Sequence, residues 1–435
     1  MKLKDIISEH ISGDWGNKDS SNEAPCAVYC VRGADIVPIN NDSYNDIPLR
    51  YISYKSFESK SLQSGDLIIE KSGGSPTQST GRITYVSQSL IAEKPNIVCS
   101  NFCTAIRLKN RWYPKFVYYY WQYIYNAGVF FNFEGKTSGI KNLQLDNALS
   151  SIDIPEYTLS QQITIADTLS KLEQKIALNR EINRNLEAMA RQLYDYWFVQ
   201  FDFPDENGRP YKSSGGKMIW NDRLKQLIPE GWTHITIERY ANIQNGATPS
   251  TSNELNYGGD IVWITPKDLS DQSQKFTFKG ERSITNAGYK SCSTTLLPKG
   301  TVLLSSRAPI GLLSIAAVDL CTNQGFKSLV PKNESEQRFL YYLVDQYLPF
   351  IKQMGSGTTF REVSKDELAK LKVPDVPSDL IEKWDNEAKS LFDRQEIILK
   401  EIDTLTKQRD ELLPLLMNGQ VSVMPSEVNC DLSHD

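Results

Sequence analysis

Histidine is scarce in this sequence, and no segment is apolar enough to suggest a membrane span. The 435 residues include three histidines, His10, His234 and His434, and none of them lies in a motif. A histidine-based active site or a histidine-rich metal site is therefore nearly excluded. No run of about 18 or more apolar residues occurs, and the segment that begins at Met1 lacks the apolar stretch of a signal peptide. We expect a soluble, cytoplasmic protein without a membrane partner.

Cysteine is too sparse for a disulfide framework. The seven cysteines are an odd number spread thinly along the chain, which is typical of reduced thiols in a cytosolic protein. The pairs Cys26/Cys30 and Cys99/Cys103 share a four-residue spacing. Each pair lies in an expected strand, which lacks the tight turn of a zinc knuckle. We therefore predict small buried side chains and no metal site.

The sequence also lacks the loops with which enzymes hold nucleotides. Gly135-Lys136-Thr137 ends as a Walker A motif does, but Phe130 stands where that motif requires its first glycine. We find no glycine-rich strand-to-helix turn and no serine-nucleophile elbow. The pattern therefore indicates a binding protein without a cofactor of its own. The net charge of −5 does not exclude nucleic acid, because a local basic face matters more than the total.

What the sequence does contain is an internal duplication. A glycine turn followed by a buried strand recurs as Leu62–Ile69 and Leu297–Leu304. Each match is weak alone, but six in one order indicate two related globular domains. The other five are Val31–Ile36 with Ile264–Leu269, which pairs Asp35 with Asp268; Cys99–Asn101 with Cys321–Asn323; Lys115–Tyr119 with Arg338–Tyr342; Gly135–Gly139 with Gly355–Thr359; and Ile152–Pro155 with Leu371–Pro374.

A long helix is expected after each globular domain. Apolar residues alternate three and four apart, the heptad spacing of a coiled coil, and neither Gly nor Pro interrupts the segments before Pro204 and Pro414. One helix per repeat gives each an obvious partner, and Asn179 and Asn183 would fix the register at some cost in stability. The expected seam consists of Ile165, Leu169, Leu172, Ile176, Asn179, Asn183, Leu186, Leu391, Ile398, Ile402, Leu405 and Leu412.

These patterns predict an α+β chain in which two repeated globular domains each precede a long helix. The expected organisation is a first globular domain over 1–155, a helix over 156–200, a linker of turns and loops over 201–228, a second globular domain over 229–374, a second helix over 375–418 and a short tail over 419–435.

Two segments are especially specific, the central run Ala190–Pro204 and the C-terminal run Leu412–Val421. They resemble segments of the specificity subunits of type I restriction–modification enzymes. The first domain departs more from the family, as is expected of domains that read different half-sites. In the second domain the similar segments are Asn245–Pro249, Trp263–Leu269, Ser306–Gly311 and Gly355–Thr359.

The resemblance implies two target-recognition domains and two long helices packed antiparallel as a spacer. It implies a non-catalytic subunit that binds double-stranded DNA, in which each domain reads one half of an asymmetric, gapped bipartite site. The helices would set the gap and dock two methyltransferase subunits, and two motor–nuclease subunits would join the complex. S-adenosylmethionine, ATP and magnesium would belong to those subunits, which methylate adenine and cleave DNA in an ATP-dependent reaction.

The candidate DNA contacts are polar residues on loops that could enter the major groove or touch phosphate. For any one of them, a solvated or turn-stabilising role is an equal alternative. In the first domain the candidates are Arg32, Lys71, Ser75, Thr77, Gln78, Arg82, Lys136 and Thr137; in the second they are Thr265, Lys267, Ser306, Arg307, Thr358 and Thr359.

Two other interpretations stay open. A specificity subunit that serves a stand-alone adenine methyltransferase would show the same sequence features. A structural coiled-coil adaptor would explain the helices but not two matched domains rich in polar loops, and salt-dependent DNA binding would separate it from a DNA reader. An undetected hydrolase is the least favoured, because neither a histidine constellation nor a nucleotide loop is present.

Overall fold

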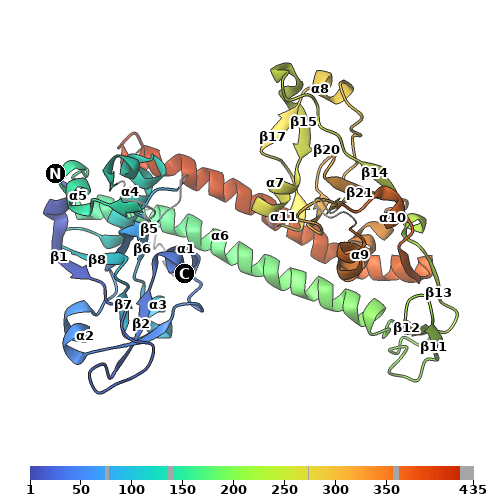
Figure 1. Cartoon of the computed structure of the whole chain (residues 1–435), viewed down its shortest axis with the longest axis horizontal. Coiled ribbons are helices and arrows are strands. Elements are labelled where there is room, and N and C mark those ends of the chain that lie inside the picture. Colours follow the sequence, from blue (N-terminus) through green and yellow to red (C-terminus); the bar gives the residue numbers. More distant parts are fainter. Residues whose placement is uncertain (74–77, 136–140, 273, 356–361, 422–435) are drawn as a thin grey trace, which may run out of the picture. The chain divides into compact units, whose positions relative to one another are not determined.

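The computed structural model describes residues 1–73, 78–135, 141–272, 274–355 and 362–421 (Figure 1). The chain divides into two compact units, and each long helix contributes to both. Unit 1 comprises Met1–Leu178 with Ile402–Asp435, and unit 2 comprises Asn179–Glu401. Within the described part, none of the helices is both long and apolar enough to span a bilayer.

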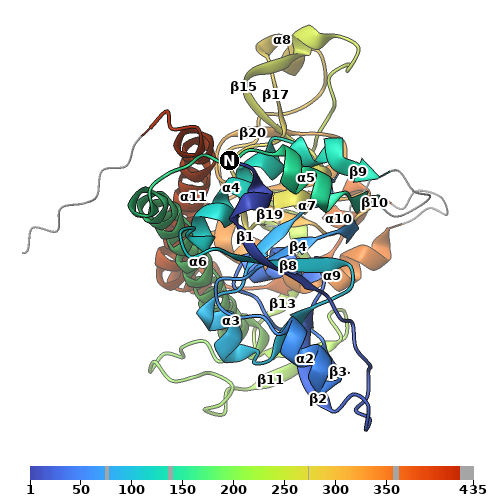
Figure 2. The same cartoon turned by 90° about the vertical axis from the view of Figure 1, so that its left-hand side faces the viewer.

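Unit 1 contains three small sheets, and their strands are labelled in Figure 2. The first has the order β1 (Ile7–Ser12), β8 (Cys103–Leu108), β4 (Leu67–Glu70), β6 (Ile83–Tyr85); the second β3 (Leu49–Ile52), β2 (Cys26–Val31), β7 (Ile97–Cys99); the third β5 (Ser72–Gly73), β10 (Lys141–Leu143), β9 (Glu134–Gly135). The helices of its globular part are α1 (Ile36–Asn40), α2 (Tyr54–Lys60), α3 (Gln88–Glu93), α4 (Pro114–Asn126) and α5 (Leu145–Ser151).

Unit 2 repeats the first two of these sheets with one added strand. The orders are β14 (Ala241–Asn245), β21 (Phe326–Pro331), β18 (Val302–Ser305), β19 (Leu313–Ala316), β16 (Phe276–Thr277), and β17 (Arg282–Ile284), β15 (Tyr257–Ile264), β20 (Leu320–Thr322). Two further pairs are β11 (Met218–Asn221) with β12 (Gln226–Pro229) and β13 (Thr233–Thr236) with β22 (Lys372–Asp375). The short helices are α7 (Pro266–Gln272), α8 (Asn286–Lys290) and α10 (Lys365–Ala369), and the longer α9 covers Glu336–Met354.

Strand pairing confirms that the two globular parts repeat one fold. In both units the second sheet holds one antiparallel pair, β2–β3 or β15–β17, and one parallel pair, β2–β7 or β15–β20. The glycine turn also recurs, because Gly65 and Gly300 have φ values of 99° and 93°, where a residue with a side chain is strained. Each unit therefore obtains its strand order from the same local signals.

One sequence match is wrong by a single residue. The amide of Asp14 donates to the carbonyl of Cys99, whereas the equivalent amide of Ala247 donates to Thr322. Cys99 therefore corresponds to Thr322, not to Cys321. The sequence match had aligned the two cysteines with each other. Strand register is fixed by the backbone hydrogen bonds between strands and not by the identity of a residue. Cys99 and Cys103 also lie in consecutive strands, β7 and β8, instead of in one.

The two long helices pair at opposite ends in the two units. They are α6 (Leu159–Tyr194), which continues into a π-helical turn over Asp195–Val199, and α11 (Ser378–Met417). In unit 1 the beginning of α6 shares a core with the end of α11, as Leu169 and Leu416 show. In unit 2 the end of α6 packs on the beginning of α11, where the rings of Tyr194 and Trp384 lie 5.9 Å apart. The helices therefore run antiparallel.

The expected seam residues are all at least partly buried. Ile165, Leu169, Ile176, Asn179, Ile398 and Ile402 are buried, and Leu172, Asn183, Leu186, Leu391, Leu405 and Leu412 are partly buried. In the described part of the chain, neither Nδ2 of Asn179 nor Oδ1 of Asn183 has a hydrogen-bond partner. Buried polar groups of this kind lower stability, and in a helix pair they restrict register.

The second long helix passes through Pro414, because α11 continues to Met417. The buried side chains of Leu413 and Leu416 hold this last turn on the core of unit 1. The segment 201–228 is also more than turns and loops, since it contains the β11–β12 hairpin, in which Trp220 pairs with Leu227.

Candidate nucleic-acid interface

A buried carboxylate organises the candidate residues of unit 1. Glu70 ends β4 and accepts two hydrogen bonds from Arg82, at 2.8 Å from Nε and 2.6 Å from Nη2. A Cβ on Gly33 would lie 2.6 Å from Oε1 of Glu70, and one on Gly73 would lie closer still. The backbone approaches the carboxylate so closely that both positions require glycine. The head of Arg82 is thus oriented by Glu70, with its side chain 19% exposed.

Arg32 is engaged in a turn. Its Nε and Nη2 donate to Asp35 at 2.9 and 2.7 Å, and Nη2 also donates to the carbonyl of Asp46 at 2.9 Å. The Asp35 carboxylate in addition accepts from the backbone N–H of Arg32 at 2.8 Å. The equivalent Asp268 accepts from the backbone N–H of Thr265 at 2.7 Å. The match of Asp35 with Asp268 is therefore confirmed, and both carboxylates stabilise the same turn.

A second carboxylate in unit 1 holds the segment that follows Gln78. Glu134 in β9 accepts from the backbone N–H of Thr80 at 2.8 Å and pairs with Lys141 at 3.0 Å. Burial raises the pKa of Glu134, but the bonds to Thr80, Lys141 and Ser79 outweigh it and leave the pKa below its usual value. Gln78 is exposed, and its carbonyl accepts from Lys141 at 3.4 Å.

Unit 2 has a comparable arrangement around Glu362. This carboxylate accepts from Nε of Arg307 at 3.0 Å and from Nζ of Lys327 at 3.1 Å. Burial raises the pKa of Glu362, yet its bonds to Lys327 and Arg307 bring the pKa below the usual range. Lys327 is buried, whereas the side chain of Arg307 is 48% exposed. Glu362 therefore orients the guanidinium of Arg307, while the side chain remains accessible to solvent.

The remaining candidates differ in accessibility. Lys267 is exposed on α7 and pairs with Glu281 at 2.8 Å. Ser306 is buried, and its hydroxyl donates to the carbonyl of Gly325 at 3.2 Å, so its side chain faces the interior of the unit. Lys71 is half-buried in the β4–β5 connection, where its amide donates to Phe102. Ser75, Thr77, Lys136, Thr137, Thr358 and Thr359 lie outside the described residues.

Comparisons with known proteins decide the family. The model of the type I restriction modification DNA specificity domain matches residues 1–188 and 229–413. The chain belongs to this family. The two matched stretches cover both globular repeats and most of both long helices, so family membership and the duplicated fold agree.

Relatives within the family are specificity subunits. The chain is 39% identical over 164 residues to the type I restriction enzyme MjaIX specificity subunit of Methanocaldococcus jannaschii, a match that covers 36% of this chain and 38% of that relative. It is 25% identical over 338 residues to the HindI specificity subunit of Haemophilus influenzae, covering 66% of this chain and 73% of the relative. The chain thus matches well under half the length of the first relative and most of the second.

A solved structure shares the fold. The crystal structure of the type I restriction–modification S subunit from M. genitalium aligns with a TM-score of 0.60 and 16% sequence identity, over 96% of this chain and 95% of that chain. At this identity the comparison supports the fold alone. It agrees with a specificity-family architecture of two globular repeats and two long helices.

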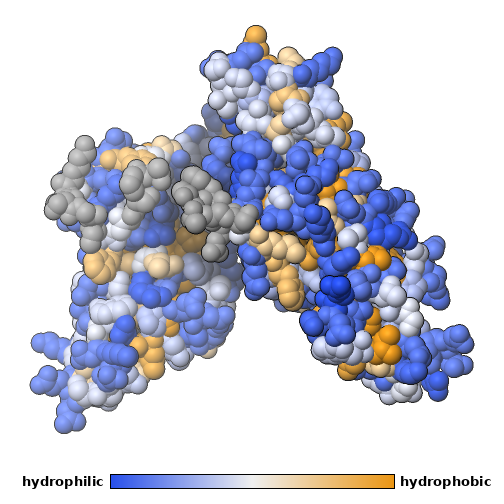
Figure 3. Space-filling view, turned by 45° about the vertical axis from the view of Figure 1, so that its right-hand side comes forward, coloured by the Kyte–Doolittle hydropathy of each residue, from blue (hydrophilic) through white to orange (hydrophobic). Residues whose placement is uncertain are grey.

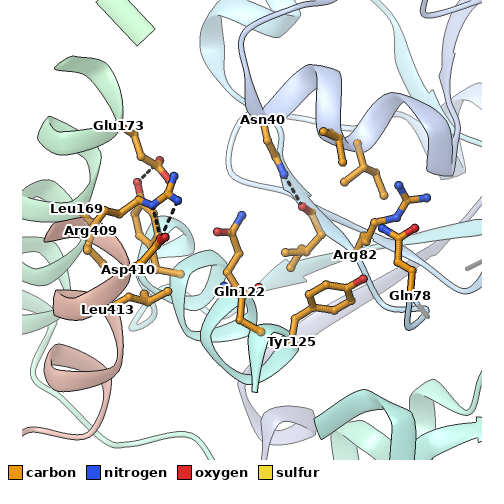
Figure 4. Close-up of a pocket in the computed structure, with 15 residues that line it drawn as sticks. Asn40, Gln78, Arg82, Gln122, Tyr125, Leu169, Glu173, Arg409, Asp410 and Leu413 are labelled. Atoms are coloured by element: carbon orange, nitrogen blue, oxygen red, sulfur yellow. Dashed lines mark hydrogen bonds and ion pairs between the residues drawn. The ribbon is translucent and has the colours of Figure 1, made fainter. Parts of the chain in front are cut away.

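A cavity in unit 1 is lined by Gln78 and Arg82, two of the candidate DNA contacts. Its volume is about 290 Å³, and Figure 4 shows Gln78, Arg82 and Tyr125 on one side and Gln122 and Asn40 nearby. Amide, phenol and guanidinium groups can hydrogen-bond to base edges or phosphate. In the described part of the chain, no group of three or more His, Cys, Asp or Glu side chains could hold a metal ion.

Two arginines that were not among the candidates from the sequence have a distinct environment in the structure. Arg50 in β3 and Arg282 in β17 each stack on an aromatic ring, whereas Arg32, Arg82 and Arg307 are bound to carboxylates. No pattern in the sequence identifies a stacked arginine, because its aromatic partner is brought close only by the fold.

Proposed function

We propose that the chain is the DNA-specificity subunit of a type I restriction–modification complex. The globular part of each unit reads one half of an asymmetric, gapped bipartite site in double-stranded DNA. The observation that carries this proposal is the duplicated fold, in which two units of the same strand order carry different polar side chains near the equivalent strands β4 and β18. In unit 1, Glu70 at the end of β4 binds Arg82, which precedes β6; in unit 2, Arg307 follows β18 and is bound by Glu362.

The long helices act as the spacer that sets the gap. α6 has 36 residues and α11 has 40. At 1.5 Å per residue these lengths correspond to roughly 54–60 Å. Buried polar residues such as Asn179 and Asn183 would resist slippage of one helix along the other, which suits an element whose length matters. The helices also dock the methyltransferase subunits.

The chain itself carries no catalytic step in this proposal. Its polar clusters consist of ion pairs and turn-stabilising carboxylates, and the sequence offers no nucleotide loop or histidine constellation. Two methyltransferase subunits would supply S-adenosylmethionine-dependent adenine methylation, and two motor–nuclease subunits would supply the reactions that need ATP and magnesium. The face of the molecule in Figure 3 is mainly hydrophilic, with separate hydrophobic patches, which is compatible with a polar DNA-binding surface.

Modified-base sequencing of host DNA tests the proposal. We expect adenine methylation at a two-part gapped motif that disappears when the gene is deleted. Replacement of residues 229–374 by the same region of a relative should change one half of the motif and leave the other half intact. A motif that persists without the gene, or a swap that alters both halves, would contradict the proposal. Co-purification with and without a motor–nuclease subunit then separates a restriction complex from a stand-alone methyltransferase.

A further inference from the structure

Two arginines, one in each unit, are stacked on aromatic rings and have no acidic partner among the residues that the structure describes. The guanidinium carbon of Arg50 lies 4.0 Å from the ring centre of Trp15, and that of Arg282 lies 3.8 Å from the ring centre of Tyr257. Within the described residues, neither guanidinium makes an ion pair or a hydrogen bond to protein. Arg307, in contrast, shares a carboxylate with a lysine.

The two arginines lie on the same strand of the repeated fold. Arg50 is in β3 opposite Val28, and Arg282 is in β17 opposite Trp263. Both strands are the antiparallel neighbour of the central strand in the second sheet, and Figure 2 shows β3 beside β2 and α2, away from β9 and β10.

Their side chains also project from the same face of that strand. Val31 and Ile264 are equivalent, because their carbonyls accept from the corresponding amides of Ser100 and Asn323. With Val31 aligned to Ile264, Val28 corresponds to Ile261, which lies two residues before Trp263. Arg50 and Arg282, which lie opposite Val28 and Trp263, are therefore two positions apart on equivalent strands. Because side chains alternate between faces with a period of two, the two arginines share a face.

The aromatic partners come from different places in the two units. Trp15 follows β1, whereas Tyr257 begins β15. The arrangement is therefore not a single inherited residue pair that both copies kept. Each unit has an arginine stacked on an aromatic ring, on the same face of equivalent strands, but the aromatic residue comes from a different part of the unit.

A stacked guanidinium is suited to an anion. Stacking fixes the plane of the group, so less side-chain freedom is lost when an acceptor binds to the N–H donors at its edge. An arginine without an acidic partner also contributes its full positive charge. Phosphate oxygens match the paired donors of this planar group.

We propose that Arg50 and Arg282 bind DNA phosphates, one for each half-site. This inference rests on the proposed function, since it assigns contacts to a DNA-reading subunit. Two domains that read different bases still share the need to be positioned on the backbone, and phosphate contacts do this without sequence information. A feature found in both units therefore fits a phosphate contact better than a base contact.

The test uses the full chain assembled with its methyltransferase subunit. Arg50→Ala, Arg282→Ala and the double variant are compared by fluorescence anisotropy on a labelled duplex that carries the methylated motif and on a duplex of unrelated sequence. Each single variant should weaken binding about five- to tenfold on both duplexes and reduce the slope of log affinity against log salt by roughly 0.9. Arg→Lys at either position should retain most of the affinity, because lysine also binds phosphate as a point charge.

Matched measurements exclude other causes of a loss. Arg209→Ala removes one positive charge from an exposed pair with Asp205, outside the β3 and β17 strands, and should leave the affinity and salt slope unchanged. Thermal unfolding checks that each variant is folded. If an alanine variant is not folded, Arg50→Gln and Arg282→Gln, which keep much of the side chain but remove the charge, carry the test and should show the same losses of affinity and salt slope.

Three outcomes overturn the inference. Unchanged affinity and slope in the folded variants would show that the arginines only cover their aromatic rings. A loss confined to the motif duplex that lysine does not restore would indicate base reading. A loss equal to that of Arg209→Ala would indicate a general charge effect. A wild-type complex that binds no duplex at any salt concentration would contradict the proposed function instead.

Discussion

Arg338 and Asp385 form a buried ion pair that joins α9 to α11 within unit 2. Nη1 of Arg338 donates to both carboxylate oxygens of Asp385, at 2.9 and 3.0 Å, and each side chain is 10% exposed. A weaker contact of 3.6 Å reaches the exposed Asp393. Arg338→Met keeps the apolar part of the side chain and removes the charge. The variant therefore isolates the cost of leaving Asp385 without its partner.

The expected cost is large because the carboxylate remains buried. Breaking a buried pair typically costs about 3–5 kcal/mol, a large part of a domain's stability of about 5–15 kcal/mol. Burial already raises the pKa of Asp385 above 3.8 despite the opposing effect of Arg338. Loss of Arg338 raises it further. An acid whose pKa is raised in the folded state loses stability as the pH rises from its unfolded pKa through its folded pKa, so Arg338→Met should be more harmful at neutral pH than at pH about 4.5.

Urea unfolding of the full chain at both pH values measures this effect. Lys217→Met is the matched control, because Lys217 pairs with Glu230 on the surface with side-chain exposures of 70% and 51%. Such a solvent-screened pair contributes little to stability. Arg338→Met combined with Asp385→Leu should recover much of the loss, since no buried charge remains. A single-variant cost below about 1 kcal/mol, or one independent of pH, would refute the reasoning.

Four further substitutions test local features of the structure, with Gly208→Ala as the control for Gly73→Ala. Gly73→Ala should lower stability by about 2 kcal/mol or more in thermal unfolding, because φ is 152° and the new Cβ meets the buried Glu70 carboxylate; Gly208→Ala, with φ of 73° and open space, should cost about 1 kcal/mol. Burial raises the pKa of Glu173, so Glu173→Gln should raise Tm by roughly 2–4 °C at pH 7.5 but not near pH 4. Asn179→Leu should add about 1 kcal/mol in urea unfolding, since its Nδ2 is buried without a partner among the described residues; no gain would place a water or another acceptor there.

The parts of the fold that could be predicted depend on local signals. A turn that requires positive φ marks its glycine in the sequence, which is why Gly65 and Gly300 aligned the two repeats correctly. Heptad spacing is likewise local, and it predicted both long helices to within a few residues of α6 and α11. The third small sheet of unit 1 and the β11–β12 hairpin were missed, because their strands are two to four residues long and their pairing depends on contacts far apart in the chain.

The candidate site was predictable by residue type but not by partner. Arg82 and Arg307 were selected as polar residues on loops, yet Glu70 and Glu362 bind them through tertiary contacts that no spacing reveals. Ser306 was selected as a polar loop residue, but the fold turns its side chain inward. A stacked arginine such as Arg50 is invisible in the sequence for the same reason. Residue chemistry therefore indicates which groups can bind DNA, and the fold decides which of them face it.

The carboxylates beside the candidate arginines bear on how an acidic chain could read DNA. Glu362 holds Nε of Arg307 and partly neutralises it, so this arginine attracts phosphate less strongly than a free one, while its two Nη groups keep a fixed direction. An arginine that attracts phosphate weakly but keeps a fixed direction adds little affinity for DNA in general. It can still discriminate between base sequences. Arginines without acids, Arg50 and Arg282, would then supply the attraction that Arg307 lacks. A division of labour of this kind makes a net charge of −5 compatible with DNA recognition, because the reading groups and the positioning groups are different residues.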